Sequence, residues 1–181
     1  MVKLQLGSIE IHLTREDIVA VEADAIVNAS NTRLHLGHGV SGAIKRAAGP
    51  GLQREMYSLA PIPETGITET GAYGLKHVGR ILHVPSRSGK PAVIRRAYAN
   101  VLERSRERGF HRVVLPSLGT GARRGALSAT ASARLLAEAL VQHHADHGDA
   151  PGLELIVTIP GPSSFEAYRT VLLQTEGITP L

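Results

Sequence analysis

The stretch "VNASNTRLHLGHGVSGAIKRAAG", residues 27 to 49, decides the fold class of this chain. The "DAIV" segment that leads into it is short, β-branched and almost wholly apolar, which is typical of a central strand buried on both faces. A glycine-rich loop and then an alanine-rich helix that ends at Gly49 follow the strand. Asn28 and Asn31, which are costly to bury without partners, stand where the loop begins. Glycines between a strand and a helix indicate a backbone that a ligand approaches closely.

Other segments of the chain repeat this alternation of strands and helices. Periodicity predicts an opening hairpin over 2–14, strands over 71–75, 80–85, 112–117 and 153–159, and helices over 39–49, 51–61, 91–109, 126–148 and 163–174. Alternating strands and helices are typical of a mixed α/β domain with a largely parallel central sheet. Ligands of such sheets bind beyond the carboxyl ends of the strands.

The composition narrows the class of protein. The chain has 181 residues, enough for a single domain over 1–181. Hydrophobic residues make up 43% and charged residues 20%, which excludes a mostly disordered chain. No cysteine is present, so the sequence offers no disulfide, thiolate metal site or cysteine nucleophile. Charges interrupt the N-terminal apolar run, and no stretch approaches a membrane span, so we expect a cytoplasmic protein without a signal peptide.

The charge of the chain favours anionic partners. The net charge is +4, and the sequence pI is about 9.8. Nucleic acid is not expected as a partner, because there is no Trp and aromatic residues make up only 3%, too few for a base-stacking platform.

A second glycine-rich loop, "SLGTGARRG" (117–125), follows the buried strand "RVVLP" and precedes a long helix. Its glycines allow backbone N–H groups to point outward together, and we expect the helix N-terminus to add partial positive charge, as in phosphate-binding loops. The loop lacks both the GK[ST] ending of a Walker A motif and the GxGxxG pattern. Taken alone, it could equally be a plain glycine-rich turn.

The two loops together resemble the signature of the macrodomain family. "EADAIVNASN", the glycine loop and "GVSGAIKRAAG" are similar to the family's "DAIVNAAN" and "GVxxAIxxAAG", and "VVLPSLGTGARRG" resembles its second loop. The resemblance covers nearly the whole chain and implies a three-layer α/β/α sandwich that binds ADP-ribose at the rim of the sheet. It implies no metal and no cofactor.

The resemblance also implies roles for particular residues. Asp17 would accept a hydrogen bond from the adenine amino group, Ile18 would supply a backbone N–H and an apolar wall, and Asn31 would orient the distal ribose. The expected diphosphate loops are Gly37, His38, Gly39 and Val40, and then Leu118, Gly119, Thr120, Gly121, Ala122 and Arg123. Asn28 is expected to bond loop backbone from the buried strand end. A turn cap is the alternative role for Asp17.

Four positions depart from the family's pattern. Ser41 stands where one class of macrodomain hydrolases carries an aspartate, and Lys45 stands where that class often has a histidine. Arg123 replaces an aromatic residue over the distal ribose, and Pro160 falls where an adenine-stacking aromatic is common. A serine cannot act as a carboxylate base, so that class's mechanism does not transfer intact.

Other side chains have a functional and an ordinary interpretation. Lys45 could form a Schiff base or simply face solvent, and His35 and His38 could support the site or lie on the surface. His143 and His147 have metal-ligand spacing, but the sequence shows no third ligand, so with His144 they are interpreted as an exposed helix end. Arg123 and Arg124 would attract phosphate or be solvated.

These observations predict a monomeric enzyme that binds ADP-ribose and hydrolyses mono-ADP-ribosyl esters on acidic side chains of proteins, with O-acetyl-ADP-ribose as a related ester. Asn31 is the predicted catalytic residue. The expected partners are ADP-ribose and mono-ADP-ribosylated proteins, not membranes. The alternative is a non-catalytic module that only recognises ADP-ribose, for which the missing aspartate is the best argument.

Overall fold

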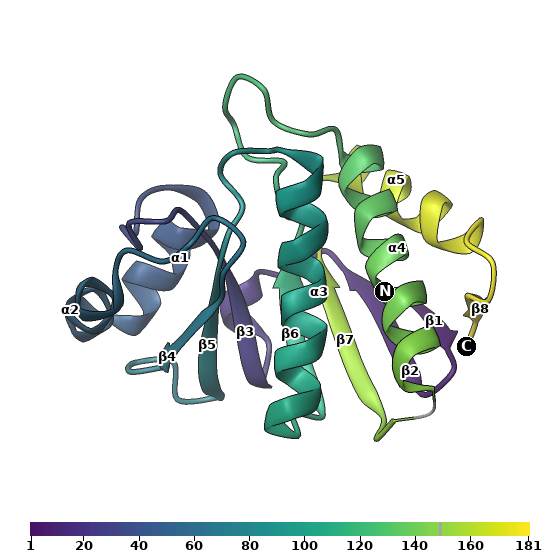
Figure 1. Cartoon of the computed structure of the whole chain (residues 1–181), viewed down its shortest axis with the longest axis horizontal. Coiled ribbons are helices and arrows are strands. Elements are labelled where there is room, and N and C mark those ends of the chain that lie inside the picture. The colour runs from purple at the N-terminus through teal and green to yellow at the C-terminus, as the bar shows by residue number, and fades with distance from the viewer. Residues whose placement is uncertain (149) are drawn as a thin grey trace.

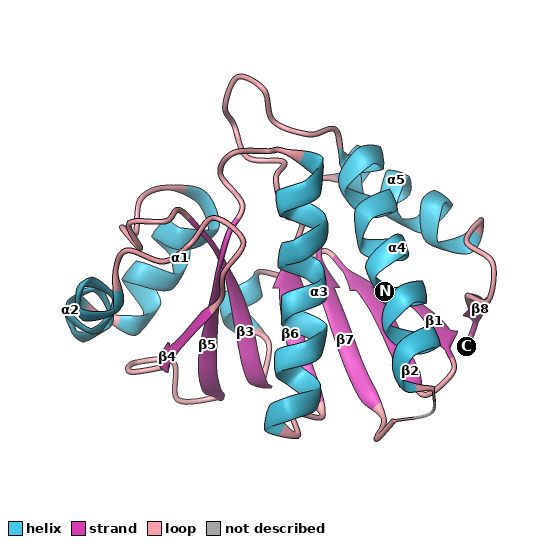
Figure 2. Ribbon diagram, in the orientation of Figure 1, coloured by secondary structure: helices cyan, strands magenta, loops and turns pink. Residues whose placement is uncertain are grey.

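The computed structural model describes residues 1–148 and 150–181 and arranges their strands in one mixed sheet (Figures 1 and 2). The strands are β1 (Val2–Leu6), β2 (Ile9–Thr14), β3 (Ala23–Ser30), β4 (Thr68–Gly71), β5 (Val78–Pro85), β6 (Arg112–Pro116), β7 (Leu153–Thr158) and β8 (Thr179–Pro180). The helices are the 3₁₀ turn η1 (Ile18–Ala20), α1 (Gly39–Ala48), α2 (Pro50–Leu59), α3 (Pro91–Arg108), α4 (Ala129–His147) and α5 (Pro162–Leu173).

The middle of the sheet is parallel, as the sequence predicts. The strand order is β4-β5-β3-β6-β7-β2-β1-β8, and the five strands from β5 to β2 run parallel to their neighbours. Only the outer strands β4, β1 and β8 pair in the antiparallel sense among the described residues, and β1 with β2 forms the predicted hairpin.

Helices cover both faces of the sheet, which gives the predicted α/β/α layers (Figure 1). Helices α3, α4 and α5 pack over one hydrophobic core, and α1 and α2 pack over the other. Strand β3 contributes to both cores: Ala25 and Val27 face the first and Ile26 faces the second, and all three are fully buried. Burial on both faces explains why "DAIV" is apolar without alternation. None of the described helices is both long and apolar enough to cross a membrane.

The predicted strand over 71–75 is wrong. The strand lies earlier, at Thr68–Gly71, and the residues after Ala72 form a turn in which Tyr73 has φ of +51°. The turn is fixed against the end of α1: Gly74 N donates to Ala48 O at 3.0 Å, and a Cβ on Gly74 would lie 2.6 Å from Ala47 O. Gly74 therefore serves close backbone packing rather than a strand.

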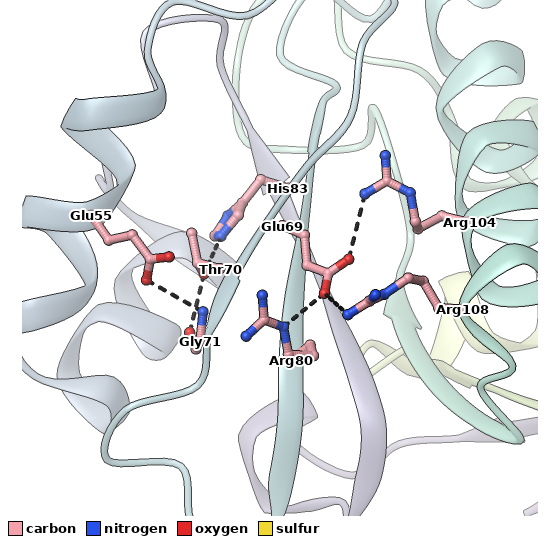
Figure 3. A network of polar contacts seen from close by, with 8 residues as sticks. All are labelled: Glu55, Glu69, Thr70, Gly71, Arg80, His83, Arg104 and Arg108. Atoms are coloured by element: carbon pink, nitrogen blue, oxygen red, sulfur yellow. Dashed lines mark hydrogen bonds and ion pairs between the residues drawn. The ribbon is translucent and has the colours of Figure 1, made fainter.

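An ion-pair cluster ties the edge strand β4 to α3 (Figure 3). Glu69 accepts from Arg80 Nε at 2.7 Å and from Arg108 Nη2 at 3.0 Å, and Arg104 lies at 3.5 Å. Burial alone would raise the pKa of Glu69, but the hydrogen bond from Arg80 and the charge of Arg108 outweigh it and lower that pKa. The cluster ties the sheet edge to the last turns of α3, near the start of β5 and away from the carboxyl ends of the strands.

Candidate functional site

Every segment predicted to bind a ligand lies at one edge of the sheet. Asp17 follows β2, the first loop (residues 31–38) follows β3, the second loop (residues 117–128) follows β6, and Pro160 follows β7. These four strands are consecutive neighbours and run parallel, so their carboxyl ends meet at the same edge. Figure 1 shows the second loop arching beyond the sheet at this edge. The structure thus assembles one candidate site from four segments that are far apart in the sequence.

The first loop is held in shape by side chains around it. Asn31 Nδ2 donates to His35 O at 3.0 Å, and Asn31 Oδ1 accepts from His35 N at 3.2 Å. The amide of Gln53, on α2, bridges the loop backbone by accepting from Leu36 N at 2.8 Å and donating to Leu34 O at 2.9 Å. Leu34 has φ of +56°, which is costly for a branched residue, yet its side chain is fully buried. These contacts pre-organise the loop before any ligand arrives.

Sequence reasoning did not anticipate these anchors. Gln53 belongs to α2, and so does Tyr57, whose hydroxyl lies 2.6 Å from His35 Nδ1 while the two rings stack. Nothing in the local pattern of α2 marks either residue, because their importance depends on contact with a loop elsewhere in the chain.

The first loop runs directly into the N-terminus of α1. His38 is the N-cap residue, and Gly39, with φ of +62°, is the first helical residue. The N–H groups of the first helical turn have no acceptors within the helix, so they form a natural anion site at the mouth of the loop. Gly42 serves packing, since a Cβ there would lie 2.9 Å from Gly37 O. The predicted residues Gly37, His38, Gly39 and Val40 therefore lie together at a helix N-terminus.

A chain of buried polar side chains lies beneath this helix end. Ser41 Oγ donates to Asn28 Oδ1 at 2.8 Å, and Asn28 Nδ2 donates to His83 Nδ1 at 3.0 Å. His83 Nε2 lies 2.8 Å from Thr70 Oγ1, which in turn donates to Gly71 O at 3.1 Å (Figure 3). Because His83 Nδ1 accepts, the ring carries its proton on Nε2 and is neutral. Burial lowers the pKa of His83 to about 3.

This polar chain corrects the expectation for Asn28 and gives Ser41 a structural role. Asn28 is structural, as expected, but its partners are the side chains of Ser41 and His83 rather than loop backbone. Ser41 is buried and also lies 3.0 Å from Ala29 O, so its hydroxyl is engaged in holding α1 to β3. Lys45, one turn further along α1, is exposed and does not share Ser41's buried environment.

The second loop is anchored by hydroxyl groups of side chains that lie beneath it. Tyr98 OH, from α3, accepts from Leu118 N at 2.9 Å, and Ser132 Oγ, from α4, donates to Leu118 O at 2.6 Å. Tyr168 OH, from α5, lies 2.7 Å from Ser117 Oγ, which accepts from Thr120 Oγ1 at 2.9 Å. Burial raises the pKa of both tyrosines, so their hydroxyls stay protonated. The start of the loop is thus fixed to all three helices of its layer.

The rest of the second loop stands further from the protein. Gly119 has φ of +77°, and a Cβ there would meet Ile94 at 2.8 Å, so glycine is required for conformation and space. A Cβ on Gly121 would meet nothing within 4 Å, which leaves the backbone of Gly121, Ala122 and Arg123 exposed for a ligand. The helix predicted over 126–148 begins later: α4 starts only after Ser128, whose side chain caps it by accepting from Ala131 N at 3.1 Å.

One further loop reaches this edge and was missed in the sequence. Residues 86–90, "SRSGK", follow β5, which is the neighbour of β3. Gly89 packs so closely under the second loop that a Cβ there would lie 2.7 Å from Gly125 O. The segment also brings the exposed Arg87 to the same edge. Its position between a buried strand and a helix starting at Pro91 is the signal that could have revealed it.

The opposite end of the site is formed by residues after β2 and β7. Asp17 is exposed, and its Oδ1 accepts from Val19 N at 3.1 Å as the cap of η1, so the alternative role considered for it is real. The side chain of Ile18 is buried in the core beside α1, so it does not form an exposed apolar wall. Of the two expected roles, the backbone N–H is the one left for a ligand contact. Pro160 is exposed, and its carbonyl accepts from Arg15 Nε at 3.0 Å, which joins the two strand ends.

The sequence of this chain is similar to those of known proteins. The sequence model of the Macro domain family matches residues 27–134. An uncharacterized protein of Mycobacterium tuberculosis is 36% identical over 158 residues, which are 80% of this chain and 43% of that protein. The O-acetyl-ADP-ribose deacetylase of Cronobacter turicensis is 35% identical over 120 residues, 61% of this chain and 68% of that one. This chain thus spans less than half the length of the mycobacterial relative.

Solved structures share the fold. The Oceanobacillus iheyensis macrodomain superposes with a TM-score of 0.82 at 23% identity, covering 94% of each chain. The Trypanosoma brucei macrodomain in complex with ADP-ribose superposes with a TM-score of 0.79 at 27% identity, covering 88% of this chain and 68% of that one. The three-layer architecture described above is therefore one that known proteins adopt.

Proposed function

The chain belongs to the macrodomain family, and from that premise we propose that it binds ADP-ribose at the carboxyl edge of the sheet and hydrolyses esters of ADP-ribose. One observation carries the proposal. Four consecutive parallel strands bring Asp17 at the start of η1, the N-terminus of α1 and the glycine-rich second loop to the same edge of the sheet. The O-acetyl-ADP-ribose deacetylase among the relatives and the ADP-ribose complex among the similar structures support this ligand.

In this proposal different segments of the site hold three parts of the ligand. The diphosphate lies between the N-terminus of α1 and the backbone of Gly121 and Ala122, where N–H groups and no metal neutralise its charge. Adenine lies toward Asp17, whose Oδ2 is free to accept from the exocyclic amine, since only Oδ1 caps η1 among the described contacts. The distal ribose lies beside Asn31.

Ester hydrolysis suits a site without a carboxylate at position 41. In an ADP-ribosyl ester of Asp or Glu, the leaving group is the side-chain carboxylate. Its conjugate acid has a pKa of about 4, so it can leave without help from a general acid. Water attacks the ribose carbon, the carbon–oxygen bond to the side chain breaks, and the water's proton passes to solvent. Positioning of that water and of the ribose can supply a large part of the rate enhancement. O-acetyl-ADP-ribose is also an ester, but there water attacks the acetyl carbonyl carbon, the bond from that carbon to the ribose oxygen breaks, and the ribose oxygen takes a proton from water while the acetic acid formed loses one to solvent. The carboxylate leaving group is therefore a feature of the protein-linked ester.

Asn31 is the residue proposed to position the ribose. Its amide is bonded to His35 backbone, so its direction is fixed before the ligand binds. Ser41 is not proposed to act in chemistry, because its hydroxyl is buried and bonded to Asn28.

A single-turnover assay on glutamate-linked ADP-ribose tests this assignment. Asn31→Ala is expected to lose at least about tenfold in turnover, since misplacing the reacting carbon is costly. Ser41→Ala is expected to fold and to keep most of its turnover, with a loss of folding stability of about 1–3 kcal/mol because the buried Asn28 Oδ1 is left without its donor. Equal loss in both variants would mean that the Ser41 hydroxyl takes part in the reaction.

A module that recognises ADP-ribose without hydrolysing it is the second candidate, favoured by the structural engagement of Ser41 where a carboxylate base would stand. The same assay separates the two. If the wild-type protein binds ADP-ribose by calorimetry but releases no label from an automodified ADP-ribosyltransferase, the hydrolase proposal falls and this one replaces it.

A further inference from the structure

Two neighbouring helices bring three metal-ligating side chains together outside the carboxyl edge. His143 and His147 lie four residues apart on α4 and therefore share one face of it. Glu103 faces them from α3, with its Oε2 at 3.0 Å from His147 Nε2. One nitrogen of each histidine and one oxygen of the glutamate all lie within 4.8 Å of one another. Within residues 1–148 and 150–181 this is the only such group of three. The sequence shows the histidine pair, but its third member becomes evident only when α3 packs on α4.

The geometry is close to that of a transition-metal site. Zinc binds histidine nitrogen and carboxylate oxygen at about 2.0–2.2 Å, which places ligand atoms about 3.4 Å apart in a tetrahedron. The three side chains are only partly buried, so they are not locked in place by packing on every side. The imidazole rings are already near each other, with centroids 4.6 Å apart. All three residues line an open groove between α3 and α4, so a cation has a path from solvent.

Neighbouring charges set limits on the affinity. Arg106 bonds both oxygens of Glu103, including Oε2 at 3.2 Å, so a metal ion must take over that second contact. Asp146 lies on the same helix but is bonded to Gln142 Nε2 at 2.8 Å. Competition from Arg106 and a carboxylate count of one favour a site of micromolar rather than nanomolar affinity.

We propose that Glu103, His143 and His147 form a site for a divalent transition metal of the zinc class, with the fourth position open to water. Two imidazoles with one carboxylate favour Zn²⁺, Ni²⁺ or Cu²⁺ over Mg²⁺ and Ca²⁺, which prefer all-oxygen ligands. The metal would clamp α3 to α4. The site is separate from the proposed ligand site, because both helices begin at the carboxyl edge of the sheet and these residues lie in their later turns. Its failure would leave the proposed function untouched.

Calorimetry with ZnCl₂ on the tag-free, chelator-stripped protein tests the proposal. One equivalent is expected to bind to the wild type, and the double variant His143→Ala/His147→Ala is expected to weaken binding at least tenfold. His144→Ala is the matched control, since it removes a histidine of the same helix that is not in the cluster, and it is expected to bind as the wild type does. MgCl₂ is expected to give no binding.

A thermal measurement provides the second readout. At a zinc concentration about 100 times Kd, the wild type and His144→Ala are expected to unfold about 5–10 °C higher than in chelator, and Glu103→Gln and the double variant are expected to show a smaller shift. Because each variant is compared with itself in chelator, any effect of the substitution on the fold cancels. Zinc binding and stabilisation that are unchanged in the double variant, or absent from the wild type, would overturn the assignment.

Discussion

The buried, neutral state of His83 makes the stability of this protein depend on pH in a predictable way. The pKa of His83 is lowered to about 3 in the fold by burial, whereas an unfolded histidine has a pKa of about 6.5. Between these values the unfolded chain binds one proton more than the folded one, so the free energy of unfolding decreases as the pH falls. The expected slope is about 1.4 kcal/mol per pH unit, which amounts to about 2 kcal/mol between pH 7 and pH 5.

Urea unfolding of the wild type and of His83→Gln at pH 7, 6 and 5 measures this contribution. A glutamine carries no charge between pH 5 and pH 7. Its amide can still donate to Thr70 Oγ1, because the Thr70 hydroxyl itself donates to Gly71 O. The variant is expected to be less stable at pH 7, because one buried bond to Asn28 is lost or weakened, but to lose stability more slowly as the pH falls. The remaining histidines and the carboxylates titrate in both proteins, so the difference between the two slopes isolates His83.

A second measurement protects the prediction against a variant that folds poorly. Nitrogen-15 NMR of the wild type at pH 5 is expected to show His83 as a neutral ring protonated on Nε2, the tautomer that the bond from Asn28 Nδ2 requires. Two results would refute the reasoning: parallel loss of stability in wild type and variant, or a His83 ring that gains a proton near pH 6.

The remaining predictions concern the proposed ligand site and are read out by calorimetry with ADP-ribose. Asp17→Ala is expected to weaken binding by about 1.5–3 kcal/mol, the value of a hydrogen bond to a charged group, and unchanged affinity in the folded variant would place adenine elsewhere. Gly121→Glu is expected to abolish binding without unfolding the protein, because its Cβ enters open space, and Gly121→Gln, the uncharged control, is expected to bind better than the glutamate variant. Gln53→Ala is expected to leave two backbone groups of the first loop without their partner, to lower the melting temperature and to weaken binding; a loss of stability with full affinity would mean that the loop does not need this anchor.

The sequence predicted the fold wherever its information is local. Buried parallel strands are apolar without alternation, and proline at the start or glycine at the end marks several helices, as Pro91 and Gly109 do for α3, so most elements fall close to their predicted places. The strand predicted at 71–75 was wrong because Gly74 packs against the end of α1, a contact that the local pattern does not contain. The two-residue strand β8 is held only by backbone pairing to β1 and has no periodicity to detect.

The candidate site also has features that local sequence predicts and features that it does not. The loops themselves could be predicted, because glycines after buried strands mark them and parallel strands bring them to one edge. The side chains that hold the loops could not be predicted. Gln53 and Tyr98 bond backbone that is far away in the sequence, and Asn28 bonds His83 on the neighbouring strand β5. Polar partners of this kind are fixed by tertiary packing, which a single sequence does not encode locally.

The two loops of the candidate site are anchored in different layers of the protein. The first is held by α2 and its residues Leu34 and Leu36 belong to one core, whereas the second is held by α3, α4 and α5 and its Leu118 belongs to the other. Because the sheet separates these cores, each loop can be redesigned together with its own helices without repacking its counterpart. Combinatorial libraries could therefore vary one side of the site at a time, and changes in folding stability found separately on the two sides should combine additively, because the two sets of anchoring residues lie in different cores.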